Sequence, residues 1–161
     1  MSASRTLIVF YSRSGTTRRI AQALSGILKC DLEEITEPRR RTGFLGYIRS
    51  LLEARLMLPS IIAPNHHDVS SYDLVVIGTP VWAWSLSSPV RAYLTATASK
   101  LPEVAFFCTL GARGSENAFA QMTAIVGKTP RAVCAITQRE ASSGSHVERL
   151  AAFQKALAKS H

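Results

Sequence analysis

Several features that mark particular protein classes are missing from this sequence of 161 residues. Its three cysteines, Cys30, Cys108 and Cys134, are too few and too widely spaced for a disulfide framework or a zinc site. No apolar run approaches the roughly 20 residues that cross a membrane. Residues 1–4 lead directly into a strand-like run, so we expect no signal peptide. We therefore expect buried free thiols, no metal site, no integral membrane segment and a cytoplasmic location.

Acidic residues are also scarce, because 11 Asp and Glu stand against 19 Lys and Arg, which gives a net charge of +8. This excess would suit an anionic ligand, a nucleic acid or an acidic membrane surface. A nucleic-acid or regulatory binding module is one interpretation, but the sequence lacks the motifs and interleaved aromatic residues of such domains. We therefore expect no nucleic-acid partner. A hydrophobic content of 47% and the chain length fit a single domain over residues 1–161.

Short apolar runs at residues 6–11, 73–78, 104–109 and 131–136 indicate four buried strands. The runs are continuous rather than alternating, which is typical of parallel strands covered by helices on both faces. A weaker strand is predicted over 30–36, and helical spacing of apolar residues predicts helices over 17–29, 89–97, 116–126 and 145–160. This alternation predicts an α/β fold of three layers, with a doubly wound, five-stranded parallel sheet.

One stretch, residues 37–72, is longer than this alternation needs, and we interpret it as an insertion between the second and third strands. It opens with Arg39-Arg40-Arg41 and continues with a predicted amphipathic helix over 44–58. The helix could pack on the sheet edge with a solvated basic face, form a lid or a homodimer contact, or lie on a membrane surface. The following His66-His67 pair is predicted to lie on a loop surface rather than to bind metal.

The loop after the first strand is rich in hydroxyl groups. It reads Ser12-Arg13-Ser14-Gly15-Thr16-Thr17 and is followed by a predicted helix. Amide groups at a helix N-terminus favour a phosphate, hydroxyls can donate to its oxygens, and a glycine allows close approach. The alternative is that the hydroxyls merely cap the helix. The loop matches neither the ATPase pattern GxxxxGK[ST] nor the dinucleotide pattern GxGxxG.

The run from Leu7 to Thr17, followed by Ile20-Ala21, resembles the signature of flavodoxins, in which a hydroxyl-rich loop holds the phosphate of FMN. Where flavodoxins usually have Gly-Asn-Thr, this chain has Gly15-Thr16-Thr17. The resemblance implies a flavodoxin-like fold with strand order 2-1-3-4-5 and FMN as cofactor. It assigns the phosphate to Ser12, Arg13, Ser14, Gly15, Thr16 and Thr17.

Two later loops resemble the flavodoxin loops that flank the flavin ring. The resemblance assigns contacts with the ring to Thr79, Pro80, Val81, Trp82 and Ala83, with Trp82 stacked on it. It assigns further contacts to Thr109, Leu110, Gly111, Arg113 and Gly114. The second loop lacks the stacking aromatic residue that flavodoxins often have there, so one face of the ring would be open or covered by the insertion. The role of Trp84 is left open between covering the edge of the site and packing on the insertion.

The resemblance implies an oxidoreductase that takes electrons from NAD(P)H or a redox protein and passes them to a quinone-like acceptor. It implies no catalytic side chain, and the alternative is a non-catalytic electron carrier that docks on a protein partner. Flavodoxins are usually acidic near the ring, whereas these loops carry only Glu116, against Arg113. Position 83 is alanine, for which the positive φ of this turn is costly. We interpret both features as favouring two-electron chemistry.

Overall fold

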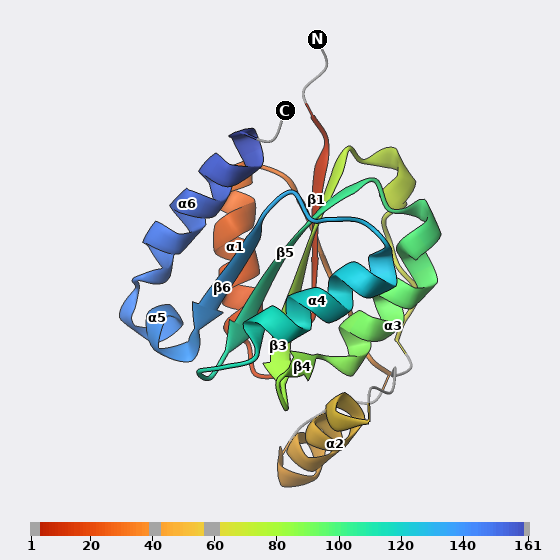
Figure 1. Ribbon diagram of the computed structural model, residues 1–161, viewed down its shortest axis with the longest axis vertical. Coiled ribbons are helices and arrows are strands. Elements are labelled where there is room, and N and C mark those ends of the chain that lie inside the picture. The colour runs from red at the N-terminus through yellow and green to blue at the C-terminus, as the bar shows by residue number, and fades with distance from the viewer. Residues whose placement is uncertain (1–3, 39–42, 57–61, 160–161) are drawn as a thin grey trace.

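The computed structural model describes residues 4–38, 43–56 and 62–159. Five parallel strands form a sheet in the order β2-β1-β3-β5-β6, as Figure 1 shows. They are β1 (Thr6–Phe10), β2 (Asp31–Glu34), β3 (Leu74–Trp82), β5 (Glu103–Leu110) and β6 (Val133–Thr137). The predicted five-stranded parallel sheet and its order are confirmed. A further strand, β4 (Ser85–Leu86), pairs antiparallel with the end of β3 and was not predicted.

The described residues contain six α-helices. They are α1 (Thr16–Leu28), α2 (Gly43–Arg55), α3 (Ser88–Thr97), α4 (Ser115–Val126), α5 (Gln138–Ser143) and α6 (His146–Lys159), with 3-10 turns at Val69–Ser71 and Ala98–Lys100. The sequence did not predict α5, which a capping box of Thr137 and Glu140 begins directly after β6. None of the described helices is long and apolar enough to cross a bilayer.

Each face of the sheet has its own hydrophobic core. In β1, Leu7 and Val9 face one core and Ile8 and Phe10 face the other. Helices α3 and α4 cover the first face, and α1, α5 and α6 cover the second (Figure 1). Because both faces of the central strands are buried, their sequences read as continuous apolar runs rather than as alternating ones.

Strand β3 runs four residues further than its predicted end at residue 78. Thr79 and Pro80 continue the parallel pairing with β5, and Val81 and Trp82 then pair with β4. Trp82 therefore lies at the end of a strand, 7% exposed and packed in the first core, and not in a loop as the sequence suggested. Its ring meets the Tyr11 ring edge-on, with 5.6 Å between centroids.

Helix α2, in the predicted insertion, stands out from the rest of the molecule beyond the carboxyl ends of the strands (Figure 1). The residues it buries are small: Gly46, Ser50 and Ala54. Its large apolar residues are mostly exposed, which reverses the arrangement expected of a helix packed on a sheet edge with a basic outer face. Residues 39–41 and 57–58 of the predicted insertion lie outside the described residues.

Polar contacts hold α2 in place. Arg49 lies 2.8 Å from Glu53 Oε1 and 3.4 Å from Glu37 Oε2. Glu37 also accepts a hydrogen bond from the Tyr11 hydroxyl at 2.8 Å, and Ser88 Oγ of α3 donates to Glu53. The chain leaves the fold before α2 and returns to it after α2 at one point, because Ala63 N donates to Thr36 O at 2.8 Å.

The three cysteines are free, and two of them, Cys108 and Cys134, are buried. Burial raises the pKa of Cys108 to about 12 and that of Cys134 to about 11. Burial, and then the charge of Asp31, raise the pKa of half-buried Cys30 to about 11. Since the thiolate is the reactive form, roughly one thiol in a thousand or fewer is reactive at pH 8.

We therefore expect iodoacetamide at pH 8 to leave all three thiols of the native protein almost unlabelled over minutes. After unfolding in denaturant, three equivalents should be incorporated, as intact-mass measurement would record. Rapid labelling of Cys108 in the native protein would contradict the burial described here.

Candidate functional site

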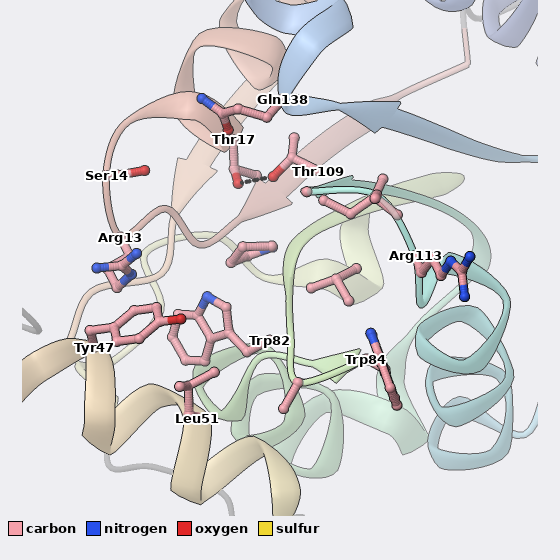
Figure 2. Close-up of a pocket in the computed structure, with 16 residues that line it drawn as sticks. Arg13, Ser14, Thr17, Tyr47, Leu51, Trp82, Trp84, Thr109, Arg113 and Gln138 are labelled. Atoms are coloured by element: carbon pink, nitrogen blue, oxygen red, sulfur yellow. Dashed lines mark hydrogen bonds between the residues drawn. The ribbon is translucent and has the colours of Figure 1, made fainter.

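A cavity of about 520 Å³ opens at the carboxyl ends of β1, β3 and β5 (Figure 2). This is the edge where parallel α/β sheets bind ligands, next to the point where strand order reverses around β1. The residues that line it are Arg13, Ser14, Thr17, Tyr47, Leu51, Pro80, Val81, Trp82, Ala83, Trp84, Thr109, Leu110, Gly111, Ala112, Arg113 and Gln138. Its size is in the range of small-molecule and cofactor sites.

One end of the cavity is formed by the hydroxyl-rich loop and the start of α1. Gly15, at φ 105°, is the N-cap of α1, and no side chain caps this helix. The amides of Thr16, Thr17 and Arg18 have no partner within the helix, as in the first turn of any α-helix. The alternative that the loop hydroxyls cap α1 is therefore wrong.

The hydroxyls of this loop instead fix its shape. Ser12 Oγ accepts a hydrogen bond from Gly15 N at 3.0 Å, and Thr16 Oγ1 donates to Gln138 Oε1 at 3.3 Å. Thr17 Oγ1 and Thr109 Oγ1, 2.8 Å apart, join the start of α1 to the end of β5, as the dashed line in Figure 2 shows. The amides of the first turn are thus held at the cavity by a loop in which the hydroxyls of Ser12, Thr16 and Thr17 are paired.

The other end of the cavity is aromatic. Figure 2 places the Trp82 indole between Tyr47 and Leu51 of α2 on one side and the rest of the cavity on the other. Arg13 lies over the Tyr47 ring, with 5.5 Å between the guanidinium carbon and the ring centroid. The insertion therefore supplies part of the cavity wall, which agrees with the expectation that it could cover one face of a ligand.

Ala83 and Trp84 form the tight turn between β3 and β4. Both adopt positive φ, 47° and 63°, a pairing that usually requires Asn or Gly. Asn117 Nδ2 holds the turn by donating to Trp84 O at 2.8 Å. A Cβ at Gly114 would lie 2.7 Å from Trp84 Cα, so only glycine allows α4 to approach this closely. The fold thus holds Ala83 at a positive φ, which the sequence analysis took to be too costly for alanine. That cost was one of the two reasons for expecting two-electron chemistry, and it no longer applies.

Most of the predicted site residues line the cavity, and five of them do not. Those five are Ser12, Gly15, Thr16, Thr79 and Gly114. Thr79 is fully buried and its Oγ1 accepts from Ser87 N at 3.1 Å, so its hydroxyl stabilises the β3–α3 connection. The others shape the loop, the α1 terminus or the turn, as described above. The binding role of each residue remains a prediction.

Sequence reasoning missed four residues of the cavity wall: Tyr47, Leu51, Ala112 and Gln138. Gln138 opens α5, a helix that was not predicted. For Tyr47 and Leu51 a signal was present, because small residues at 46, 50 and 54 recur every four positions and mark the face of α2 that packs inward.

The lining of the cavity carries two guanidinium groups, Arg13 and Arg113, and no carboxylate. The nearby carboxylate of Glu37 is only 2% exposed and is paired with Arg49 and Tyr11. The lining therefore favours an anionic ligand, or a ligand that gains electron density. This agrees with the scarcity of acidic residues noted in the sequence of the two ring loops.

The comparisons with known proteins agree with the fold. A flavoprotein from Lactobacillus acidophilus NCFM, solved in complex with FMN, has 22% identity and a TM-score of 0.70, over 89% of this chain and 98% of its own. A protein from Bacteroides eggerthii DSM 20697 has 21% identity and a TM-score of 0.71, over 90% of this chain and 98% of its own. Oxidised flavodoxin 1 from Bacillus cereus has 13% identity and a TM-score of 0.55, over 94% of this chain and 98% of its own.

A comparison with curated protein sequences gives no match. The sequence model of the flavodoxin family, in contrast, matches residues 5–134, which include the hydroxyl-rich loop, the insertion, the β3–β4 turn and the start of α4. The chain therefore belongs to the flavodoxin family.

Proposed function

We propose that the chain binds FMN in this cavity and passes electrons from a reduced nicotinamide or a redox protein to a quinone-like acceptor. FMN, when bound, supplies the redox chemistry, and the protein supplies position and electrostatics. The observation that carries the proposal is the combination, in one cavity, of an uncapped helix N-terminus at one end and an aromatic wall at the other.

The described residues fit both parts of FMN. The start of α1 offers amide donors and a positive dipole end, and Ser14 and Arg13 lie beside it on the cavity wall. The flat ring would lie in the part of the cavity that Trp82, Tyr47 and Trp84 border, where aromatic contact adds about 1 kcal/mol beyond apolar burial. No acidic side chain of the lining would oppose the negative charge of the phosphate.

The proposed direction of electron flow rests on the charge of the cavity. With Arg13 and Arg113 on its wall and no carboxylate, a ring that accepts two electrons and carries negative charge would be stabilised rather than repelled. Trp84 is 67% exposed at the mouth of the cavity, where a second flat molecule could stack on it. Because the redox chemistry would be that of FMN, we propose no catalytic side chain.

A two-part measurement tests this proposal. The protein purified after FMN loading should show flavin absorption, with FMN rather than FAD released on denaturation. Loaded protein alone should then oxidise NADPH or NADH steadily when a soluble quinone is added. Flavin binding without turnover, restored by an added redox protein, would instead assign the chain as an electron carrier. Failure to bind any flavin would overturn the proposal.

We also propose that the protein works in the cytoplasm. Support comes from Cys30, Cys108 and Cys134, all of which are free. Free thiols of this kind are characteristic of reducing compartments.

A further inference from the structure

We propose that the outer face of α2, formed by Phe44, Leu45 and Leu52 together with Leu56 directly after the helix, binds the surface of an anionic lipid bilayer, with the helix lying in the plane of the interface. This face is separate from the cavity wall, to which α2 contributes Tyr47 and Leu51. The proposal does not depend on which cofactor occupies the cavity.

The first support is that α2 buries its small residues and exposes most of its large apolar ones. Phe44, Leu45, Leu52 and Leu56 are 75%, 81%, 54% and 64% exposed. Because successive residues of a helix turn by about 100°, these four project away from the buried side of the helix. Half of the exposed large apolar residues of the described chain thus gather on one helix face, and such a concentration marks an interaction surface.

The position of this face fits a bilayer. Helix α2 stands out from the body (Figure 1), and Phe44, Leu45, Leu52 and Leu56 are exposed there, so we refer to them as the apolar ridge. A lipid interface accepts the apolar side of a helix directly, to a depth of about 5–10 Å. A helix of this kind can also fill a groove on a protein partner, so the charges beside the ridge decide between the two.

The charges around the ridge select an anionic partner. Arg55 is exposed at the end of α2, and the whole chain carries a net charge of +8. The one acidic residue of α2, Glu53, is directed toward the body, where Arg49 Nε at 2.8 Å and Ser88 Oγ at 2.5 Å bind its carboxylate. Apolar residues flanked by arginine are the composition of helices that lie on anionic membranes.

The same charges disfavour a second copy of the chain. A symmetric dimer through this ridge would pair the same surface of two copies, each with an exposed Arg55 beside its apolar side chains. It would also bring together two chains that each carry a net charge of +8. Like charges across an interface oppose association, whereas anionic lipid headgroups relieve the same repulsion.

Vesicle co-sedimentation of the full chain tests this inference. We expect binding to phosphatidylcholine vesicles that contain phosphatidylglycerol, weak binding to phosphatidylcholine alone, and loss of binding as salt rises from about 0.05 M to about 0.5 M. The double variant Leu45→Ser with Leu52→Ser should bind at least about tenfold more weakly, since each change removes apolar area from the ridge. Phe44→Ser with Leu56→Ser is a second variant with the same expected loss.

The matched control replaces two exposed valines elsewhere, Val133→Ser with Val147→Ser, which are 49% and 59% exposed on β6 and α6. Its vesicle binding should equal that of the unmodified protein. An equal loss in this control, or no binding of the unmodified chain to the anionic vesicles, would overturn the inference. A dimer in light scattering that Leu45→Ser with Leu52→Ser dissociates, without vesicle binding, would reassign the ridge to self-association.

Discussion

Replacing Ser14 and Thr16 together by aspartate should weaken FMN binding at least about hundredfold, because like charges placed together cost several kcal/mol. Both positions lie in the loop that leads into α1, and Ser14 lies on the cavity wall. A carboxylate at position 14 would lie on the cavity wall, and one at position 16 would add negative charge to the first turn of α1, beside the proposed position of the phosphate. A fluorescence titration of FMN with the folded, purified variant measures the change in affinity directly.

Riboflavin, which lacks the phosphate, separates this effect from damage to the fold. Its affinity should change only a few-fold in the same variant, so the ratio of the two affinities reports the phosphate contact. Acidic residues near a helix N-terminus favour the helix, so the variant should unfold at the same temperature or slightly higher. The neutral variant Ser14→Asn with Thr16→Asn should retain most of its FMN affinity. Equal losses for FMN and riboflavin would place the phosphate elsewhere.

Gly78→Ala should lower the free energy of unfolding by about 3 kcal/mol and the melting temperature by about 10 °C. Gly78 lies in β3, between β1 and β5, where a Cβ would overlap the ring of Phe107. The Phe107 side chain is fully buried against the second core and cannot move aside without opening that core. Thermal and urea unfolding, followed by circular dichroism, would measure the loss.

The same substitution at Gly26 is a control of opposite sign. Gly26 lies in α1 and a Cβ there would have no neighbour within 4 Å, so Gly26→Ala should stabilise by about 0.5–1 kcal/mol. Combining Gly78→Ala with Phe107→Ala should cost less than the sum of the two single changes, since the second removes the overlap. Strict additivity would show that the ring of Phe107 is not what excludes a side chain at position 78.

The elements that could be predicted from the sequence are those whose signal is local. The central strands β1, β3 and β5 are buried on both faces, so the apolar run of each identifies it without knowledge of its neighbours. The loop after β1 combines several hydroxyls with one glycine before a helix, and the structure accordingly places Gly15 at positive φ at the start of α1.

What could not be predicted depends on contacts between distant segments. Trp82 reads as a loop residue until β4 folds back and extends β3, and Ala83 accepts a positive φ only because Asn117 of α4 holds the turn. Gln138 lines the cavity although it follows β6, a strand at the edge of the sheet. The contacts that tie α2 to the body are those of Arg49 with Glu37 and of Glu53 with Ser88, and apolar spacing alone predicted the wrong inward face for this helix.

The backbone hydrogen bond from Ala63 N to Thr36 O also has a consequence for how this chain can change in evolution. The chain leaves the fold after Thr36 and returns at Ala63, so the length of the segment between them is independent of the register of β2 and β3. Such a segment can be exchanged or lost in one genetic step while the sheet and the hydroxyl-rich loop keep their places. A related chain without it would keep the end of the cavity that this loop forms and lose the wall that Tyr47 and Leu51 form here.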